Sequence, residues 1–397
     1  MTKYKGLAIS WFFAPYQGSA DFDFFKRIKD TNLEFDVVQI KRDQKDLSLL
    51  DYITNAKINR LEVETEHKEP RTAKTRDDFK KYALDYFEKN NQKFDFIISH
   101  SNEVPSHAIA YEIKQRKKDL PWIAYFGDLI KMNPYIKYIP GYPLVQEDNT
   151  TEQTTIESAD LIILNNEYQK ELMFSGANEQ YIHKAVVIPH CYEPKMYKGV
   201  DKPLSWADGK FRLLHLGTLY HTKRTAEPIL KAVDRLIQIY PHYKNKFIVE
   251  FYGGAPYTHD ISVHAFMKNR NQVVFQDSVS YNESLNLMQR ADALLLIDGL
   301  FNEAEDGLSV NPFFAGKLTD YMGAKKPIMA VTMDKGPSAD ILKASGNVIA
   351  DDKTDRIAYV LKKYIDQKVM PDYSYYENYT CDNVAQQMQQ AIESVIK

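Results

Sequence analysis

Residues 310–331 read VNPFFAGKLTDYMGAKKPIMAV, and this stretch decides how the chain is expected to fold. The apolar residues Leu318, Tyr321 and Met322 recur at helical spacing, so they predict a helix over residues 317–324 with one face buried. The apolar run IMAV follows directly and predicts a buried strand. A loop, a short helix and a strand in direct succession form a junction of the kind at which open α/β folds bind ligands.

The start of this helix suits an anionic ligand. Gly316 precedes the helix, and a residue without a side chain lets a ligand approach the backbone, while the free N–H groups of a first helical turn favour a phosphate. Asp320 lies one turn further along the same side, where its carboxylate can accept hydrogen bonds from sugar hydroxyls. A plain helix with a solvated Lys317 and a solvated Asp320 fits the same residues, so the stretch alone leaves both interpretations open.

Outward from this stretch, apolar runs alternate with amphipathic segments in both halves of the chain. The runs are GLAIS, DVVQI, FDFIISH, PWIAYF and DLIILN, then FRLLHLG, FIVEFYGG, QVVFQD, ALLLID, PIMAV and NVIA. They predict two α/β domains, residues 1–195 and 196–372, each with a parallel sheet covered by helices, and a shared cleft. Residues 373–397 predict a C-terminal helix that crosses back to the first domain. Its apolar residues at helical spacing are Val384, Met388, Ile392 and Val395.

One segment of the first half has a different composition. Residues 55–78 hold as many basic as acidic residues and few large apolar ones. Because such a segment has little to bury, we expect it to form an exposed, mobile insertion rather than part of the core.

Composition narrows the class of protein. The 44% hydrophobic and 26% charged content is typical of a globular protein, and a net charge of −3 offers no basic excess for nucleic acid. Cys191 and Cys381 form no disulfide framework, which favours the reducing cytoplasm. No run of about 18 apolar residues predicts a membrane span. Peripheral contact with the inner face of a membrane and assembly into a homo-oligomer stay open.

Polar residues follow the predicted strands of the first half. The loop WFFAPYQGSA places Gly18 where backbone can pass close to a ligand before a helix begins. His100 ends the run FDFIISH, at the sheet edge where open α/β folds bind ligands, and can act there as a proton acceptor or a hydrogen-bond donor. A purely structural histidine is the alternative, and we assign that role to His107. Asp128 follows the run PWIAYF as another polar cap.

The stretch LLHLGTLYHTKRTAEPIL, residues 213–230, predicts a strand, a tight turn at Gly217 and a helix that begins near Thr225. Lys223 and Arg224 stand at the helix entrance. Two cations beside exposed N–H groups form a plausible diphosphate site, because arginine can bind two oxygens at once. Two solvated cations in a connecting loop are the alternative.

Residues 273–298 predict a strand, a loop, a helix and a second strand. Backbone groups from Val279 to Tyr281 can read the edge of a base, and Tyr281 can stack on it. We assign the apolar residues that follow to the core of the helix; they are Leu285, Leu287 and Met288. After Asp298 comes the long acidic loop GLFNEAEDGLSVNPFFAG, which we expect to act as a flexible cover over the ligand.

In this order, the segments resemble GT-B glycosyltransferases of the retaining family 4 type along nearly the whole chain. LGTLYHTKR is similar to that family's phosphate-binding turn, in which Thr218 replaces the usual arginine, Lys223 keeps the lysine, and Arg224 adds a charge. VVFQDSVSYNESLNLMQRADALLLID is similar to its base-binding segment, and AGKLTDYMGAKKPIMA to its nucleotide-holding loop and helix. Two acidic residues separated by seven are usual in that last segment. Asp320 matches the second, which implies ribose binding, but Pro312 occupies the first.

The missing acidic residue has two candidate replacements, Asn311 and Asp306. In the first half, QGSA is similar to the family's glycine loop with one glycine missing, and SHS resembles its acceptor-side histidine segment, which implies that His100 and Asp128 lie on the acceptor side. ESADLIILNNEY and VVIPHCYEP resemble the segments that lead to the linker. The resemblance implies that the backbone of five consecutive residues surrounds the phosphates. These residues are Phe314, Ala315, Gly316, Lys317 and Leu318.

The resemblance therefore implies a GT-B fold and transfer of a hexose from a nucleotide sugar to a glycan, lipid-linked or protein-linked acceptor, as in polysaccharide biosynthesis for the bacterial cell surface. UDP is the nucleotide expected from family frequency. Neither a metal nor another cofactor is expected, because no Asp-x-Asp follows a predicted strand. Two alternatives stay open: a non-catalytic GT-B subunit that binds an acceptor or a partner transferase, and a sugar-nucleotide epimerase with the same fold.

Overall fold

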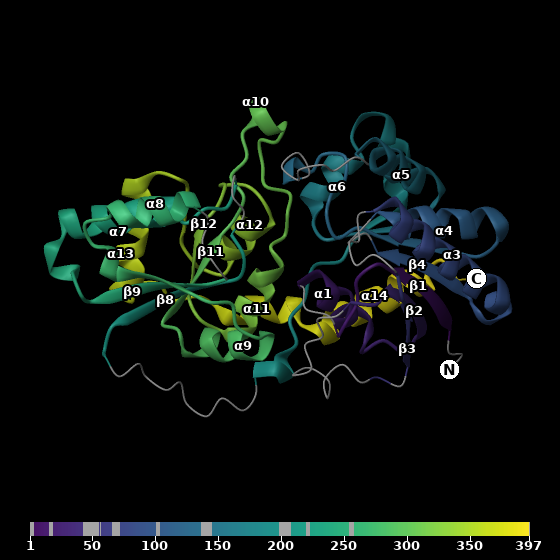
Figure 1. The fold of residues 1–397 in the computed structure, drawn as a ribbon, viewed down its shortest axis with the longest axis horizontal. Helices are drawn as coiled ribbons and strands as arrows, with labels where there is room; N and C mark the ends of the chain where they lie inside the picture. The colour runs from purple at the N-terminus through teal and green to yellow at the C-terminus, as the bar shows by residue number, and fades with distance from the viewer. Residues whose placement is uncertain are drawn as a thin grey trace. The chain divides into compact units, whose positions relative to one another are not determined.

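The computed structural model forms two compact units. Unit 1 comprises Met1–Cys191 and Cys381–Lys397, and unit 2 comprises Tyr192–Thr380. Each unit is a parallel sheet flanked by helices (Figure 1). The structure describes residues 4–15, 19–42, 55, 57–65, 72–100, 104–135, 145–197, 208–219, 223–253 and 258–396.

The sheet of unit 1 has seven strands in the order β3-β2-β1-β4-β5-β6-β7. The strands are β1 (Lys5–Ser10), β2 (Glu34–Ile40), β3 (Ile58–Val63), β4 (Phe96–His100), β5 (Trp122–Tyr125), β6 (Leu161–Leu164) and β7 (Ala185–Val187). Every pair of neighbours runs parallel, and the register sets His100 of β4 between Ser10 of β1 and Tyr125 of β5. The uniformly apolar runs of the central strands fit this sheet, because a parallel sheet is buried on both faces.

Helices and 3-10 turns connect these strands. They are α1 (Ser19–Ile28), α3 (Ala73–Asn90), η2 (Asn91–Lys93), α4 (Pro105–Arg116), α5 (Val145–Ser158), α6 (Glu167–Met173), η4 (Gly176–Lys184) and α14 (Cys381–Glu393). The last of these closes the core from the far end of the chain. Val384, Met388 and Ile392 of α14 are fully buried, and the helix packs against α1.

The expectation of an exposed insertion over residues 55–78 was wrong for its described part. Residues 58–63, INRLEV, form the edge strand β3 in parallel register with β2, and Val63 is only 4% exposed. Within the helix α3, which begins at Ala73, Thr75 and Arg76 are buried. Charged residues alternate with apolar ones along β3 because an edge strand exposes part of its surface. Because of these charged residues, the sequence analysis interpreted the strand as part of an exposed insertion.

The sheet of unit 2 has six strands in the order β10-β9-β8-β11-β12-β13, all parallel. The strands are β8 (Phe211–Leu216), β9 (Phe247–Tyr252), β10 (Val273–Gln276), β11 (Ala293–Ile297), β12 (Ile328–Val331) and β13 (Ile349–Ala350). The α-helices are α7 (Glu227–Ile239), α8 (Thr258–Phe266), α9 (Tyr281–Arg290), α10 (Glu303–Asp306), α11 (Gly316–Ala324), α12 (Pro337–Ala344) and α13 (Thr354–Ile365). The 3-10 turns are η5 (Pro194–Tyr197), η6 (Pro241–Tyr243), η7 (Arg270–Gln272) and η8 (Tyr373–Tyr379).

Alternate residues of the central strands of unit 2 supply two separate cores. Leu213 of β8 packs with α7 and α13 on one face, whereas Leu214 and Leu216 pack with α9, α11 and α12 on the other. The helix predicted over residues 317–324 is confirmed as α11, and its apolar face contributes Leu318 and Tyr321 to the second core. This packing fixes the start of α11 beside the carboxyl end of the sheet.

The chain divides into the two units at other residues than the sequence predicted. The predicted boundaries follow residues 195 and 372, whereas unit 2 spans Tyr192–Thr380. Both turns at its edges pack against its core, and η8 also contributes the buried Tyr376 to it. Tyr197 of η5 donates a 2.9 Å hydrogen bond to the Asp320 carbonyl, and Tyr376 of η8 is fully buried and accepts one from Asn347 at 2.8 Å.

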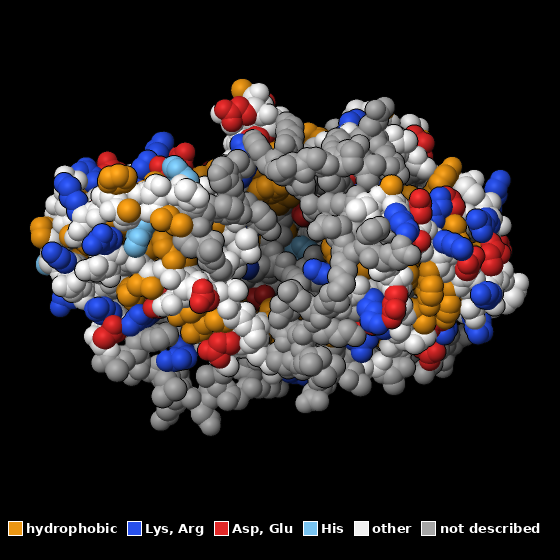
Figure 2. Space-filling model, viewed as in Figure 1, with side chains coloured by type: hydrophobic (Ala, Val, Ile, Leu, Met, Phe, Trp, Pro, Cys, Tyr) orange, Lys and Arg blue, Asp and Glu red, His pale blue; other side chains and the backbone are white. Residues whose placement is uncertain are grey.

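The charge of the surface and the apolar character of the helices also bear on function. Lys and Arg are interspersed with Asp and Glu over the face in Figure 2, so no field of one sign dominates it. Within the described residues, no helix combines the length and the apolar character that crossing a membrane requires.

Candidate functional site

The carboxyl ends of β8 and β11 and the start of α11 bring several predicted site residues together in unit 2. Gly217 follows β8 with a φ of +120°, a conformation that side chains rarely adopt. A Cβ built on Gly217 would lie 2.9 Å from Nζ of Lys317. The predicted phosphate turn and the predicted helix start are therefore in contact, and Gly217 is required both for its backbone angle and for space.

Lys317 meets a histidine that the sequence analysis did not assign. Its Nζ lies 3.3 Å from Nε2 of His215, and Nδ1 of His215 lies 2.9 Å from the Leu295 carbonyl. Because a carbonyl only accepts, Nδ1 carries the proton and Nε2 accepts from Lys317. Burial is the main cause that holds the pKa of His215 well below its usual value, so the imidazole stays neutral. Its place next to the end of a central strand was the available signal in the sequence.

Lys223 and Arg224 each pair with a buried carboxylate rather than with solvent. Nζ of Lys223 lies 2.7 Å from Oδ2 of Asp306 and 3.9 Å from Glu305. Nη2 of Arg224 lies 3.3 Å from Oδ1 of Asp298, a fully buried residue. These pairs hold both cations at the carboxyl edge of the sheet, so the alternative of two solvated cations does not apply.

Lys317 differs from these two cations. Within the described part of the chain it has no carboxylate within 4.0 Å, and its recorded contact is the neutral His215. Burial lowers the pKa of Lys317 to about 7, and repulsion by Arg224 adds to this, while attraction by Asp298 opposes it. Arg224 and Lys317 therefore lie close enough to repel each other, and an anion between them would relieve that repulsion.

Asp320 and Tyr281 form a second part of the site. The hydroxyl of Tyr281, in the first turn of α9, donates a 2.7 Å hydrogen bond to Oδ1 of Asp320. Asp320 is 8% exposed, so its carboxylate is held rather than solvated. The candidate base-stacking residue and the candidate ribose carboxylate are thus neighbours. The side chain of Val279 is exposed just before α9, whose first turn is capped by Ser280.

The remaining residues of the loop and helix start are buried. Phe314 and Ala315 belong to the core beneath α11, and Ala315 precedes the helix without a side-chain cap. Leu318 is fully buried, and its N–H donates to the Ala315 carbonyl at 2.9 Å. Leu318 therefore offers a ligand neither a side chain nor a free N–H. The uncapped N–H groups at Gly316 and Lys317 are the ones that suit an anion. Thr218 follows Gly217 and is exposed.

Neither candidate for the missing acidic residue is available as a free group. Nδ2 of Asn311 donates to the Gly299 carbonyl at 3.1 Å, and its Oδ1 accepts from the N–H of Phe313 at 2.9 Å. Asp306 is engaged with Lys223 and also accepts from the N–H of Asn302 at 2.8 Å. Both side chains fasten the loop between β11 and α11, so we no longer expect Asn311 to bind a donor sugar.

The histidine predicted to act in unit 1 is a packing residue. His100 is 1% exposed, stacks on Tyr125 with centroids 4.7 Å apart, and contacts Ser10 Oγ at 3.1 Å. Burial, the largest cause, lowers the pKa of His100 to about 3. A group with that pKa is a weak base, which argues against the expected role as a proton acceptor near neutral pH. His107 is buried on Ser99 Oγ at 2.7 Å, which confirms its structural role.

The other two candidates of unit 1 have different outcomes. Asp128 follows β5 and is exposed to solvent, whereas His100 is buried. Gly18 lies outside the described residues.

A buried charged network, which the sequence analysis missed, lies beside the strand ends of unit 1. Arg27 is fully buried and donates to Oδ2 of Asp23 and to Oδ1 of Asn165, both at 2.9 Å. Nδ1 of His190 lies 2.7 Å from Oδ1 of Asp23, and Tyr125 donates to Asp23 at 2.5 Å. Despite burial, Arg27 and His190 hold the pKa of Asp23 well below its usual value. Every member is engaged, so we interpret the network as structural.

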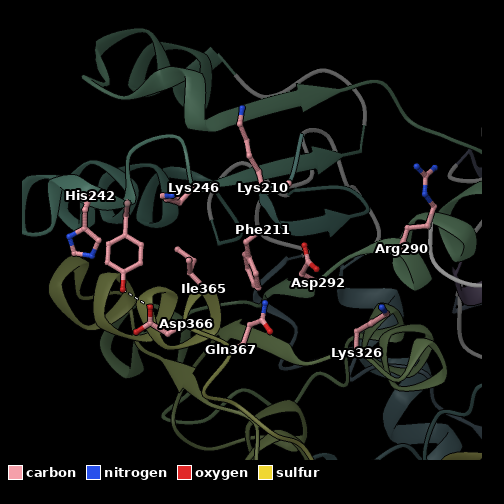
Figure 3. A pocket seen from close by; sticks show the side chains of 12 residues that line it. Lys210, Phe211, His242, Lys246, Arg290, Asp292, Lys326, Ile365, Asp366 and Gln367 are labelled. Carbon is pink, nitrogen blue, oxygen red and sulfur yellow. Dashed lines mark hydrogen bonds between the residues drawn. The ribbon is translucent and has the colours of Figure 1, made fainter. Parts of the chain in front are cut away.

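Figure 3 shows a separate cavity of about 600 Å³ at the opposite, amino end of the unit 2 sheet. Its cations do not converge: Lys210, Arg290 and Lys326 point in different directions (Figure 3). Asp366 is already bound to the hydroxyl of Tyr243. This cavity therefore lacks the convergent polar groups expected of a binding site.

Comparison with known proteins agrees with this architecture. No protein-family model and no curated protein matches the sequence. Among solved structures, the lipopolysaccharide outer core galactosyltransferase WaaB matches with a TM-score of 0.65 and 14% identity over 98% of this chain and 99% of its own. An E. coli trehalose-6-phosphate protein bound with UDP-2-fluoro glucose matches with a TM-score of 0.64 and 11% identity over 99% of each chain.

A putative UDP-N-acetylglucosamine 2-epimerase from Listeria monocytogenes also matches, with a TM-score of 0.65 and 12% identity over 99% of this chain and 96% of its own. Full-length matches of this kind define the fold. The chain has the two-domain α/β architecture of GT-B proteins, which confirms the predicted fold class.

Proposed function

We propose that this protein is a glycosyltransferase that moves a hexose from a nucleotide sugar, with UDP as the nucleotide, to a glycan, lipid-linked or protein-linked acceptor. One observation carries the proposal: Lys317, at the uncapped start of α11, contacts the Gly217 turn and lies close enough to Arg224, the chain neighbour of Lys223, for the two charges to repel each other, in the second unit of a GT-B fold. Fixed cations beside helical N–H groups suit a diphosphate.

The chemistry of the reaction makes this arrangement useful. As the glycosidic bond of the donor breaks, negative charge develops on the diphosphate that leaves. Preorganised cations stabilise that charge without moving, and the carboxylates Asp298 and Asp306 hold two of them in place. In our proposal no metal is needed, and the reaction retains stereochemistry because a donor phosphate oxygen accepts the proton of the acceptor hydroxyl on the same face.

The nucleoside is assigned to Asp320 and the first turn of α9. A carboxylate can accept hydrogen bonds from both ribose hydroxyls, and Asp320 is already oriented by Tyr281. Val279 is exposed in the loop that follows β10, where we expect its backbone to contact a base edge. Unit 1 is assigned to the acceptor, with Asp128 as the remaining exposed candidate.

A cytoplasmic location accompanies this proposal. Sγ of Cys191 and Sγ of Cys381 lie 3.3 Å apart as free, buried thiols. Thiols this close stay reduced most readily in a reducing compartment.

Titration calorimetry of the full chain with UDP tests the donor site. We expect binding of UDP by the native protein, and a loss of affinity of at least about tenfold in the Lys223→Ala, Arg224→Ala double variant, since each charge-assisted hydrogen bond is worth about 1.5–3 kcal/mol. The Lys231→Ala, Arg235→Ala variant removes a similar pair from the exposed surface of α7 and serves as control. Undiminished binding by the first variant would refute the phosphate assignment, provided that thermal melting shows it folded.

The structural match to an epimerase supports a second candidate, conversion of a UDP-sugar within this fold. Incubation of the purified chain with UDP-N-acetylglucosamine separates the candidates. A transferase releases UDP slowly by transfer to water, an epimerase yields an isomeric UDP-sugar without an acceptor, and a non-catalytic subunit does neither.

A further inference from the structure

Among the described residues, Lys317 is the cation of the unit 2 site that has no carboxylate within 4.0 Å. Lys223 is paired with Asp306 and Arg224 with Asp298, whereas the recorded partner of Lys317 is the neutral imidazole of His215. An ammonium group held against a neutral partner and close to a guanidinium is unstable as a cation. An arriving anion would remove that instability.

The position of this ammonium is fixed by its neighbours. His215 is fully buried in β8, and its hydrogen bond to the Leu295 carbonyl of β11 directs Nε2 at Lys317. Gly217 leaves room for the lysine side chain, because any Cβ there would collide with Nζ. His215 therefore orients Lys317 in the absence of a ligand.

The same place is the start of α11. This helix of nine residues has no side-chain cap at Ala315, so its first N–H groups remain available to an anion. The other charged groups that face Lys317 are Arg224, which repels it, and Asp298, which attracts it. Oδ2 of Asp298 is buried and has no hydrogen-bond partner among the described residues, which leaves an acceptor for a donor group on the ligand.

We propose that Lys317, oriented by His215, binds the diphosphate together with Lys223 and Arg224, and that the site takes up a proton when a nucleoside diphosphate binds. This inference rests on the proposed function and adds to it a coupling between donor binding and pH. Lys223 and Arg224 bind the diphosphate while they stay paired with their carboxylates, and Lys317 adds a charge that no carboxylate within 4.0 Å matches among the described residues.

The sign of the coupling follows from the protonation of Lys317. Without a ligand its pKa is about 7, so the amine is mostly neutral above pH 7.5. A bound diphosphate favours the charged form and raises this pKa, so the complex holds more protons than the free protein. Affinity must then fall as the pH rises, by about eightfold between pH 7.5 and 8.5 for one such group, with uptake of about 0.8 proton at pH 7.5.

Calorimetry with UDP and with inorganic pyrophosphate measures both quantities. Titrations in HEPES and in Tris at pH 7.5 give the proton uptake from the difference in observed enthalpy, and a second series at pH 8.5 gives the change in affinity. We expect uptake of about 0.8 proton in the native protein, none in Lys317→Met, and none in Lys317→Arg, which keeps the charge at both pH values. Lys231→Met on exposed α7 is the matched control and should behave as the native protein.

The outcomes separate this inference from the proposed function. Binding of UDP without proton uptake, or undiminished affinity and uptake in a folded Lys317→Met variant, overturns the role of Lys317 and leaves the donor site intact. Failure of UDP and pyrophosphate to bind the native protein overturns both proposals. The variant His215→Leu tests the positioning role: without the acceptor Nε2 the ammonium loses its hydrogen bond, so we expect the pKa of Lys317 to fall further, proton uptake at pH 7.5 to rise toward one proton and UDP to bind more weakly. Unchanged uptake and affinity in this variant would refute the positioning role.

Discussion

The hydroxyl of Tyr281 donates a 2.7 Å hydrogen bond to Oδ1 of Asp320, which joins the first turn of α9 to the first turns of α11. A buried carboxylate that loses such a donor keeps its desolvation cost. The Tyr281→Phe substitution should therefore lower the free energy of unfolding by about 1–2 kcal/mol and weaken UDP binding. Chemical denaturation and calorimetry measure the two effects. Tyr359→Phe, at an exposed position of α13, should change neither.

Gly217 combines a φ of +120° with contact to Lys317. We expect Gly217→Ala to cost about 2–3 kcal/mol of stability, because the backbone angle is strained for alanine and Nζ must move. Gly209→Ala is the matched comparison, since Gly209 has a φ of +66° with open space around it. It should cost only about 1 kcal/mol. Equal destabilisation by the two substitutions would contradict the steric part of this prediction.

Arg27 offers a test of the unit 1 network. Its removal by Arg27→Met leaves the buried carboxylate of Asp23 without its main partner, so we expect a loss of about 3–5 kcal/mol in the free energy of unfolding. Arg116→Met removes an exposed arginine that pairs with Glu88 and should cost less than about 1 kcal/mol. Urea denaturation followed by circular dichroism compares the variants. A cost for Arg27→Met no greater than that for Arg116→Met would show that the network does not stabilise unit 1.

His100 leads to a prediction about pH. Because burial lowers its pKa in the folded protein to about 3, below the ordinary value of 6.5, the unfolded chain binds the proton first as the pH falls. The stability that neutral His100 contributes is thus fully present above pH 6.5 and is lost as the pH falls toward 3. Histidine NMR signals should show His100 neutral from pH 8 down to pH 5, with exposed His183 for comparison. A titration of His100 near pH 6 would restore it as a candidate base.

How well the sequence predicted each element depends on which of its faces are buried. Central strands such as β4 are apolar on both faces, and α11 has one apolar face, so periodicity predicted both. The edge strand β3 was missed because partial exposure mixes charges into it. Helix α14 was found from its spacing alone.

The site was harder to predict because its contacts join distant parts of the chain. Lys223 and Asp306 are 83 residues apart, and Lys317 and His215 are 102 residues apart. Residue type suggested which groups can bind a diphosphate, but only the fold shows which of them already have partners. Likewise, a residue at the end of a strand can be exposed or buried, and the sequence does not show which. His100 is buried.

Unit 1 is assembled from two separated pieces of chain, and this affects its biosynthesis. Its seven strands are all translated before residue 192, yet Val384, Met388 and Ile392 of its closing helix come after the whole of unit 2. At roughly 5–20 residues per second, a ribosome needs roughly 10–40 s to make the intervening segment. Throughout that interval the nascent first unit presents an uncovered apolar surface beside α1, so it is a natural client for chaperones until translation ends.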